Sequence, residues 1–162
     1  MDQHSRTLID RVEVHSPGIA AFIARALSRL PDVARRRILQ SAFERAQYAF
    51  NRGDFEVVFA LFSAHAEYLP PPPLHDGSLI RGRQAAIEFW RQVFDRYDEN
   101  SIENLALDEA SPGSFVRRAR LRHRSSTTGE VIEYSIVQTT YLESGHVIRQ
   151  VNLLDGPVAR TC

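Results

Sequence analysis

The residues best suited to chemistry lie in the second half of the chain, where apolar and polar side chains alternate. His123 falls on the apolar parity of its stretch, and an imidazole or a carboxylate so placed can accept or donate a proton. Tyrosine and amide side chains on the same face can polarise a carbonyl group. We therefore predict catalytic roles for His123, Asp155 and Tyr134, and ligand-binding roles for Gln138 and Asn152.

Each of these residues also has a structural interpretation. His123 could be a buried core histidine, and Asp155, which follows the last strand, could pair with a surface arginine. Tyr134, Gln138 and Asn152 could be core polar groups that satisfy one another's hydrogen bonds. The sequence leaves both interpretations open, and the position of each side chain relative to a cavity would decide between them.

The predicted walls of that cavity come from the stretch between Asp54 and Trp90. Its pattern predicts a short helix over 55–62, a strand over 66–69, a loop stiffened by four prolines and a helix over 83–97. The aromatic residues expected to face a ligand are Phe62, Tyr68, Trp90 and Phe94.

The elements that must position these residues follow from hydrophobic periodicity. Helical spacing predicts helices over 19–30 and 32–50, and Gly53 with Asp54 suits a helix end followed at once by a new start. After residue 100 the period changes from helical to alternating. Strands are predicted over 102–107, 115–124, 130–142 and 146–154. Helices followed by an antiparallel meander predict an α+β domain.

Composition narrows the function. The chain has 162 residues with 20 basic and 20 acidic side chains, so its net charge does not favour nucleic acid. None of the six histidines has metal-ligand spacing, and we predict neither a metal site nor a cofactor. No apolar run is long enough to span a membrane, and we do not expect the first 16 residues, which are rich in charge, to be a secretory signal. The single cysteine, Cys162, is compatible with the predicted cytoplasmic location.

An arginine series on the predicted strand over 115–124 invites an anion-binding interpretation. Glu103 and Glu133 on the neighbouring strands can pair with these arginines across the sheet, which favours an ion-paired surface or a dimer face over a nucleic-acid site. The series consists of Arg118, Arg120, Arg122 and Arg124.

Residues 38–156 resemble the NTF2-like superfamily, with the closest likeness to its SnoaL-like branch. The residues that carry the resemblance are Gly53, Asp54, Leu61, Phe62, Gly82, Ala86, Ile87 and Phe89, followed by Gly145, Ile148 and Asp155 near the end. The resemblance implies an α+β cone in which helices close a pocket against a curved antiparallel sheet. It also implies a homodimer formed through the outer sheet face. Residues 1–37 would be an extension with an amphipathic helix at about 18–30, and 157–162 a tail.

The catalytic branches of the superfamily use acids that this chain lacks. The tyrosine of ketosteroid isomerases corresponds to Ala46 in this sequence. Their catalytic base corresponds to a position near Pro70. Their second acid corresponds to a position near Val137 or Tyr134. The late-strand carboxylate of cyclase and epoxide-hydrolase relatives corresponds to Asn152, and an amide cannot act as a base at neutral pH.

Two hypotheses follow. The chain could be a cofactor-independent cyclase or isomerase that acts on a hydrophobic, oxygenated compound of the polyketide or terpenoid kind. Alternatively, it could be a non-catalytic ligand-binding or dimerisation module on the same fold. A desolvated carboxylate or imidazole in a ligand-sized cavity would favour the enzyme.

Overall fold

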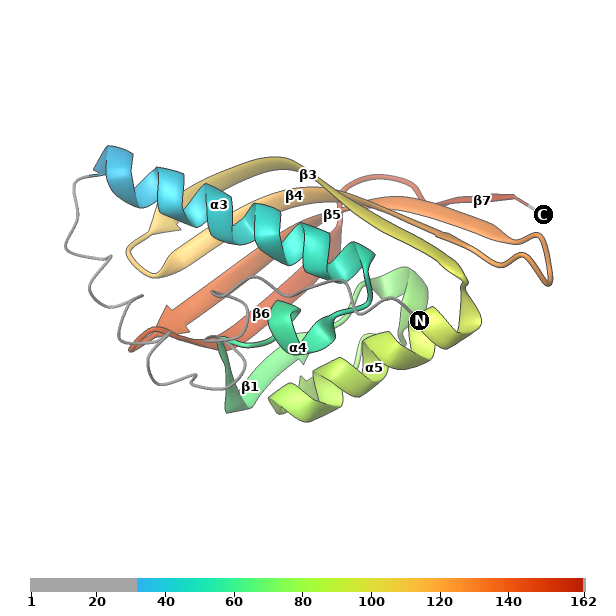
Figure 1. Ribbon diagram of the computed structural model, residues 1–162, viewed down its shortest axis with the longest axis horizontal. Helices are drawn as coiled ribbons and strands as arrows, with labels where there is room; N and C mark the ends of the chain where they lie inside the picture. The colour runs from blue at the N-terminus through green and yellow to red at the C-terminus, as the bar shows by residue number, and fades with distance from the viewer. Residues whose placement is uncertain (1–31, 162) are drawn as a thin grey trace.

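The computed structural model describes residues 32–161 and shows helices packed on one side of a curved, unclosed sheet (Figure 1). Its helices are α3 (Asp32–Asn51), α4 (Phe55–Val58) and α5 (Arg83–Arg96), with a 3₁₀ turn over Pro72–Leu74. Its strands are β1 (Phe62–Leu69), β2 (Ile80–Arg81), β3 (Glu99–Ser111), β4 (Ser114–Arg124), β5 (Val131–Glu143), β6 (His146–Leu154) and β7 (Ala159–Thr161). The predicted α+β cone is confirmed.

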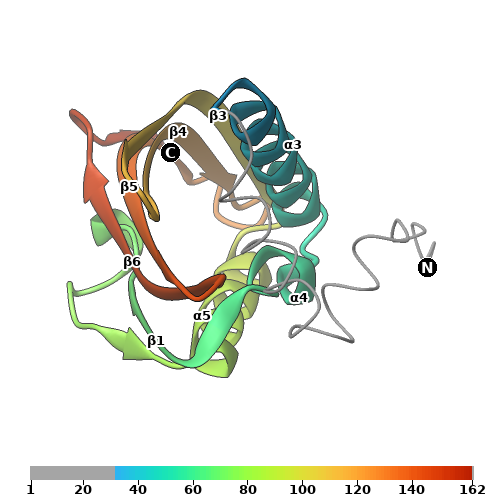
Figure 2. The same cartoon turned by 90° about the vertical axis from the view of Figure 1, so that its left-hand side faces the viewer.

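The sheet runs in the order β2-β1-β6-β5-β4-β3, and β7 pairs with β5. Every pair is antiparallel except β1 with β6, which is parallel, so the sheet is mixed rather than purely antiparallel. Viewed end-on, the sheet curves around an interior that α3 closes beside β3 and α5 closes beside β1 (Figure 2). This arrangement gives the sheet an inner face toward the helices and an outer face away from them.

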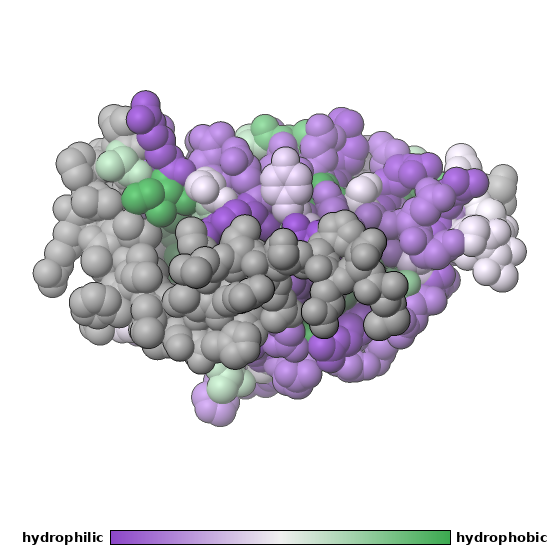
Figure 3. All heavy atoms as spheres, viewed as in Figure 1, coloured by the Kyte–Doolittle hydropathy of each residue, from purple (hydrophilic) through white to green (hydrophobic). Residues whose placement is uncertain are grey.

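Helix α3 follows its predicted range and ends at the predicted glycine turn. Gly53 has φ of +71°, which favours glycine, and the Phe94 ring would lie 3.4 Å from an added Cβ. The Asn51 side chain bonds both backbone groups of Ile102, at 2.7 Å from its N–H and 3.2 Å from its carbonyl, and so ties the helix end to β3. In the space-filling view the coloured surface of this side of the molecule is mostly hydrophilic (Figure 3).

The region after Asp54 differs from the sequence prediction. The predicted helix over 55–62 ends at Val58, and Phe62 begins β1 instead of closing the helix. Phe62 pairs with Val147 of β6, so a residue that fits the helical period belongs to the sheet instead. Strand β1 still ends at Leu69, directly before the prolines, which cannot donate ladder hydrogen bonds.

In the C-terminal meander β4, β5 and β6 match their predicted strands closely, β3 extends beyond the predicted 102–107 at both ends, and one element is added. Ser144 and Gly145 both have positive φ and form the tight β5–β6 turn. Beyond β6, β7 pairs with β5 in a segment for which the sequence had predicted only a tail. The predicted helix at 19–30 and Cys162 lie outside the described residues.

Candidate functional site

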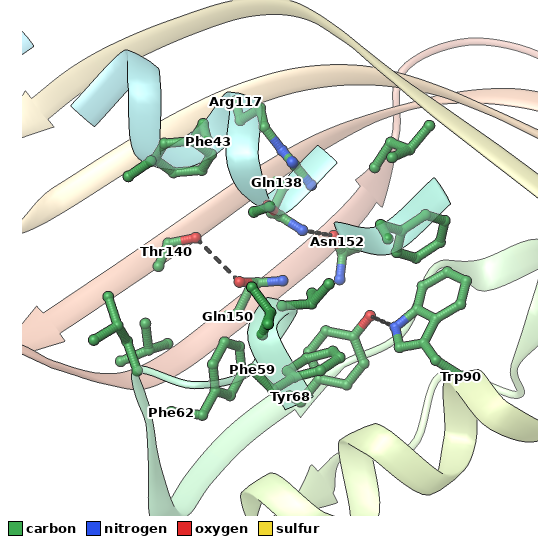
Figure 4. A pocket seen from close by; sticks show the side chains of 18 of the residues that line it. Phe43, Phe59, Phe62, Tyr68, Trp90, Arg117, Gln138, Thr140, Gln150 and Asn152 are labelled. Atoms are coloured by element: carbon green, nitrogen blue, oxygen red, sulfur yellow. Dashed lines mark hydrogen bonds between the residues drawn. The ribbon is translucent and has the colours of Figure 1, made fainter. Parts of the chain in front are cut away.

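A cavity of about 140 Å³ lies between the inner face of the sheet and the helices α3 and α4. Aromatic and aliphatic side chains form most of its wall, including Phe43, Phe59 and Phe62 (Figure 4). Its volume is close to that of a cavity of ~150 Å³ that holds benzene in another protein. A space of this volume suits a single ring rather than a fused multi-ring compound.

A row of polar side chains crosses this apolar wall. Arg117, Gln138 and Asn152 occupy aligned positions on β4, β5 and β6, and we call these three residues the polar row. Gln138 Nε2 donates to Asn152 Oδ1 at 2.8 Å, and Asn152 Nδ2 donates to the Leu69 carbonyl at 2.7 Å. The row fixes the two amides in one orientation and leaves hydrogen-bonding groups at the cavity surface (Figure 4).

A second polar pair lies one step further along the same two strands. Thr140 Oγ1 donates to Gln150 Oε1 at 3.3 Å, and both residues line the cavity. Gln150 lines the cavity from β6, whereas Ile148, two residues earlier on the same strand, is 39% exposed. Tyr141 pairs with Arg149 and Leu142 with Val147, so the bulge between these pairs displaces Ile148 from the inner face.

The Tyr68 hydroxyl is held at the cavity by Trp90. Trp90 Nε1 donates to the Tyr68 hydroxyl oxygen at 2.8 Å, and both side chains are buried. Burial raises the pKa of Tyr68 well above its usual value, more than the nearby Arg117 charge lowers it, so the hydroxyl keeps its proton at neutral pH. Trp90 occupies a lone pair of the hydroxyl oxygen, so the hydroxyl proton remains the part of this group that can donate to a ligand oxygen.

Arg117 is the buried charged residue that sequence reasoning missed. Its side chain is only 7% exposed and lines the cavity, with the guanidinium 5.6 Å from the Phe43 ring centroid. Nη1 donates to Asn104 Oδ1 at 3.1 Å, while buried Nε has no partner in the described part of the chain. Burial lowers the pKa of Arg117 to about 10, so it stays charged at neutral pH. The available signal was a cation on the apolar parity of its strand.

The structure brings His123 and Tyr134 together, but outside the cavity lining. His123 is fully buried, with Nδ1 2.7 Å from Asn100 Oδ1 and Nε2 3.0 Å from the Tyr134 hydroxyl. Asn100 Nδ2 donates to the Tyr97 carbonyl, so its Oδ1 accepts from His123 Nδ1 and Nε2 accepts from Tyr134. Burial lowers the pKa of His123 to about 4 and raises that of Tyr134, so both are neutral at neutral pH.

Two other predicted residues also lie away from the cavity lining. Asp155 is exposed after β6, where its carboxylate is 3.7 Å from Arg118 Nε. Phe94 packs edge-on against Phe50 and Phe55, at ring-centroid distances of 5.4 and 4.8 Å. By contrast, the predicted ligand-binding residues that do line the cavity are Phe62, Tyr68, Trp90, Gln138 and Asn152.

The cavity lining contains no aspartate, glutamate or histidine among the described residues. Within 32–161, no group of three or more such residues or cysteines is placed to hold a metal ion. The helices of the same range are too short or too polar to cross a membrane. The arrangement can therefore hold a ligand by hydrogen bonds and one buried positive charge, but no side chain on its wall is suited to accept a proton at neutral pH.

Comparisons with known proteins agree with this architecture. A family model described as a SnoaL-like domain matches residues 43–150. No relative is found among curated proteins. IdmH of Streptomyces antibioticus, a proposed polyketide cyclase, is 17% identical with a TM-score of 0.59, over 72% of this chain and 91% of IdmH.

Two mycobacterial structures are similar to the same degree. The Δ5-3-ketosteroid isomerase of Mycobacterium sp. is 18% identical with a TM-score of 0.60, over 75% of this chain and 96% of the isomerase. RV0760c of Mycobacterium tuberculosis, solved with estradiol-17β-hemisuccinate, is 17% identical with a TM-score of 0.59, over 73% of this chain and 92% of that one. At these identities the likeness establishes the fold.

Proposed function

The chain belongs to the SnoaL-like domain family, and from this premise we propose that it binds a small, mostly apolar, oxygenated molecule in the cavity under α3. The observation that carries the proposal is the combination of an apolar wall with a few fixed polar groups that converge on one space. Such a wall buries the hydrocarbon part of a ligand, while the polar groups select its oxygens.

The size and chemistry of the wall narrow the ligand class. A space of about 140 Å³ favours a one-ring compound, such as a small polyketide- or terpenoid-like molecule, over a steroid. The Tyr68 hydroxyl and the amide of Gln138 can both donate to a ligand oxygen. The steroid derivative bound by RV0760c and the cyclase and isomerase neighbours support a small-molecule role in general terms.

A catalytic version of the same site is the second candidate. The protonated Tyr68 hydroxyl, held by Trp90, could polarise a carbonyl during enolisation or ring closure without a cofactor. The acid–base roles of His123, Asp155 and Tyr134 stay predictions, and their distance from the lining favours binding over proton transfer.

The binding proposal is tested by blocking the cavity. Ala46 lines it from α3, so Ala46→Phe should fill the space. Ala85 is an exposed alanine on α5, and Ala85→Phe is the matched control. Native mass spectrometry of the purified proteins should show a small molecule retained by wild type and the control but lost from Ala46→Phe. Equal retention by all three proteins would contradict the proposal.

We also propose that a second copy of this chain covers the outer sheet face. Leu153 is 54% exposed there and Tyr141 is 40% exposed, which leaves apolar surface without cover in the described residues. Leu153→Asp should convert a dimer into a monomer by light scattering, whereas Leu79→Asp on the loop before β2 should not. A wild type that is monomeric by light scattering would contradict the proposed dimer. We propose, in addition, that the protein is cytoplasmic and that it has no nucleic-acid partner.

A further inference from the structure

Arg117 carries a charge into the cavity, and no acid among the described residues lies beside it to balance that charge. It is 7% exposed, and none of the carboxylates in residues 32–161 forms an ion pair with it. Burying a cation without a counter-charge is costly, and proteins usually accept that cost only where the charge is used. The balancing group is therefore to be sought outside the described chain.

The guanidinium is positioned rather than loose. Asn104 accepts from its Nη1, the Phe43 ring lies 5.6 Å from its central carbon, and the side chain extends over the cavity toward Gln138 (Figure 4). Asn104 is itself held by Gln47, whose Oε1 accepts from the Asn104 N–H at 2.7 Å, and by the Phe43 carbonyl at 3.2 Å. These contacts fix the cation but leave buried Nε unpaired.

A second donor faces the same space. Tyr68 lines the cavity, and its hydroxyl oxygen is already bonded by Trp90, so its proton is available for an oxygen of the ligand. A guanidinium and a neutral hydroxyl together provide donors but no base, which is the donor set that a monoanionic oxygen group requires. Arg45, which also lines the cavity, has an interaction of its own.

We infer that the ligand of this cavity is a carboxylate, a one-ring monoacid whose anionic group pairs with Arg117 while its ring lies against the apolar wall. This inference rests on the proposed function and adds the charge of the ligand to it. Arg117 is the one buried cation of the described lining, because Arg45 is only partly buried and has an interaction of its own. One such cation matches one carboxylate, whereas a doubly charged phosphate would bring an excess of negative charge into the wall.

The test uses a matched series on one ring: cyclohexanecarboxylate, cyclohexanecarboxamide and cyclohexylmethanol. Trp90 is the only tryptophan and lines the cavity, so its fluorescence reports binding directly. At neutral pH wild type should bind the carboxylate about tenfold or more tightly than the amide or the alcohol. This preference is measured on the unaltered protein and does not depend on the folding of a variant.

Variants then locate the charge. Arg117→Met should lose the preference for the acid while still binding the alcohol, and Arg117→Lys should retain part of it. Arg120→Met, on the outer face of the same strand, should keep the full preference. Loss of the preference in Arg120→Met as well would assign it to the general charge of the protein and overturn the inference.

The remaining outcomes separate the inference from the function beneath it. If wild type binds the amide or the alcohol as tightly as the acid, the carboxylate inference fails and the small-molecule proposal stands. If no member of the series binds, the one-ring carboxylate inference fails, and the small-molecule proposal is then decided by the retention test on Ala46→Phe. If Arg117→Met keeps the preference for the acid, Arg117 is not the partner and the inference is overturned.

Discussion

The two faces of β4 treat arginine in opposite ways. On the outer face, four arginines lie within 3.0 to 3.8 Å of a carboxylate oxygen: Arg120, Arg122 and Arg124 of one from β3, and Arg118 of one from Asp155, which follows β6. On the inner face, Arg117 is buried and has no acid beside it in the described chain. The strand thus pairs its charges where water already screens them and leaves one unpaired where water is excluded.

Stability alone would favour the reverse arrangement. Exposed ion pairs contribute roughly 0–1 kcal/mol each, whereas an unpaired buried charge costs several times more. The difference indicates that the outer arginines serve solubility or association, and that Arg117 serves a ligand. The other strands show the same contrast between the two faces, because buried polar groups are few and the loss of the hydrogen bonds of any one of them is costly.

The largest expected effect is the loss of unfolding free energy at low pH through His123, which is buried on the inner face of β4. Burial lowers the pKa of His123 to about 4, below the value of 6.5 expected after unfolding. The unfolded chain therefore takes up a proton first, so the contribution of His123 to stability is complete above pH 6.5 and is lost as the pH falls toward 4. Between pH 7 and pH 4 wild type should lose about 3 kcal/mol of unfolding free energy through this residue.

Urea unfolding of wild type and His123→Gln over that pH range isolates this contribution, since the other groups titrate alike in both proteins. The acid-induced loss of stability should be smaller in the variant by about 3 kcal/mol. No acidic side chain contributes to the shift, so added salt should leave it nearly unchanged. Parallel pH curves for the two proteins would show that His123 is not isolated from water.

The next effect concerns the hydroxyl that bridges core and cavity. Tyr68→Phe removes the acceptor of the Trp90 N–H, which is buried, and should lower the free energy of unfolding by about 1–3 kcal/mol. Tyr48→Phe, at a side chain on α3 that is 64% exposed, is the matched control and should change stability by less than about 0.5 kcal/mol. Equal effects would mean that a water replaces the lost hydroxyl.

A smaller effect of opposite sign is expected at Arg117. Arg117→Met removes an unpaired buried charge and keeps most of the apolar volume, although Asn104 Oδ1 loses a donor. The net result should be a gain of about 1 kcal/mol in unfolding free energy, measured by urea unfolding at neutral pH. A clear loss of stability would assign Arg117 a structural role through Asn104 and Phe43, and would remove the contrast between the two faces.

Much of the fold follows from local pattern, and the departures have physical causes. The helix over 32–50 and the long strands are readable because one periodicity holds over many residues and a glycine or proline ends it. Phe62 fits both the helical and the strand period, and only its pairing with Val147 decides for the strand. Strand β7 is a three-residue segment whose partner, β5, lies far back in the sequence.

The site is less predictable, since alternation gives the face of a residue but not its depth. Arg117 and His123 share the inner face of β4, yet the cavity lies beside Arg117 while His123 is enclosed by Trp90, Tyr97 and Tyr134. The sequence could not distinguish these positions, because the enclosing rings come from α5, from the segment that follows it and from β5. Arg117 did not stand out in the sequence, because four further arginines follow it within seven residues.

The smallest expected effect is at the outer arginines, and it tests whether the ion pairs of the outer face contribute to stability. Arg120 is 3.7 Å from Glu103, and both side chains are more than half exposed. Because water screens this pair, Arg120→Met should change the free energy of unfolding by less than about 0.5 kcal/mol, and less still in high salt. The measurement is urea unfolding of Arg120→Met beside Arg117→Met at low and high ionic strength. A loss above about 1 kcal/mol at Arg120 would show that the outer ladder acts as a coupled network, and the pairing on that face would then have to be explained by stability rather than by association.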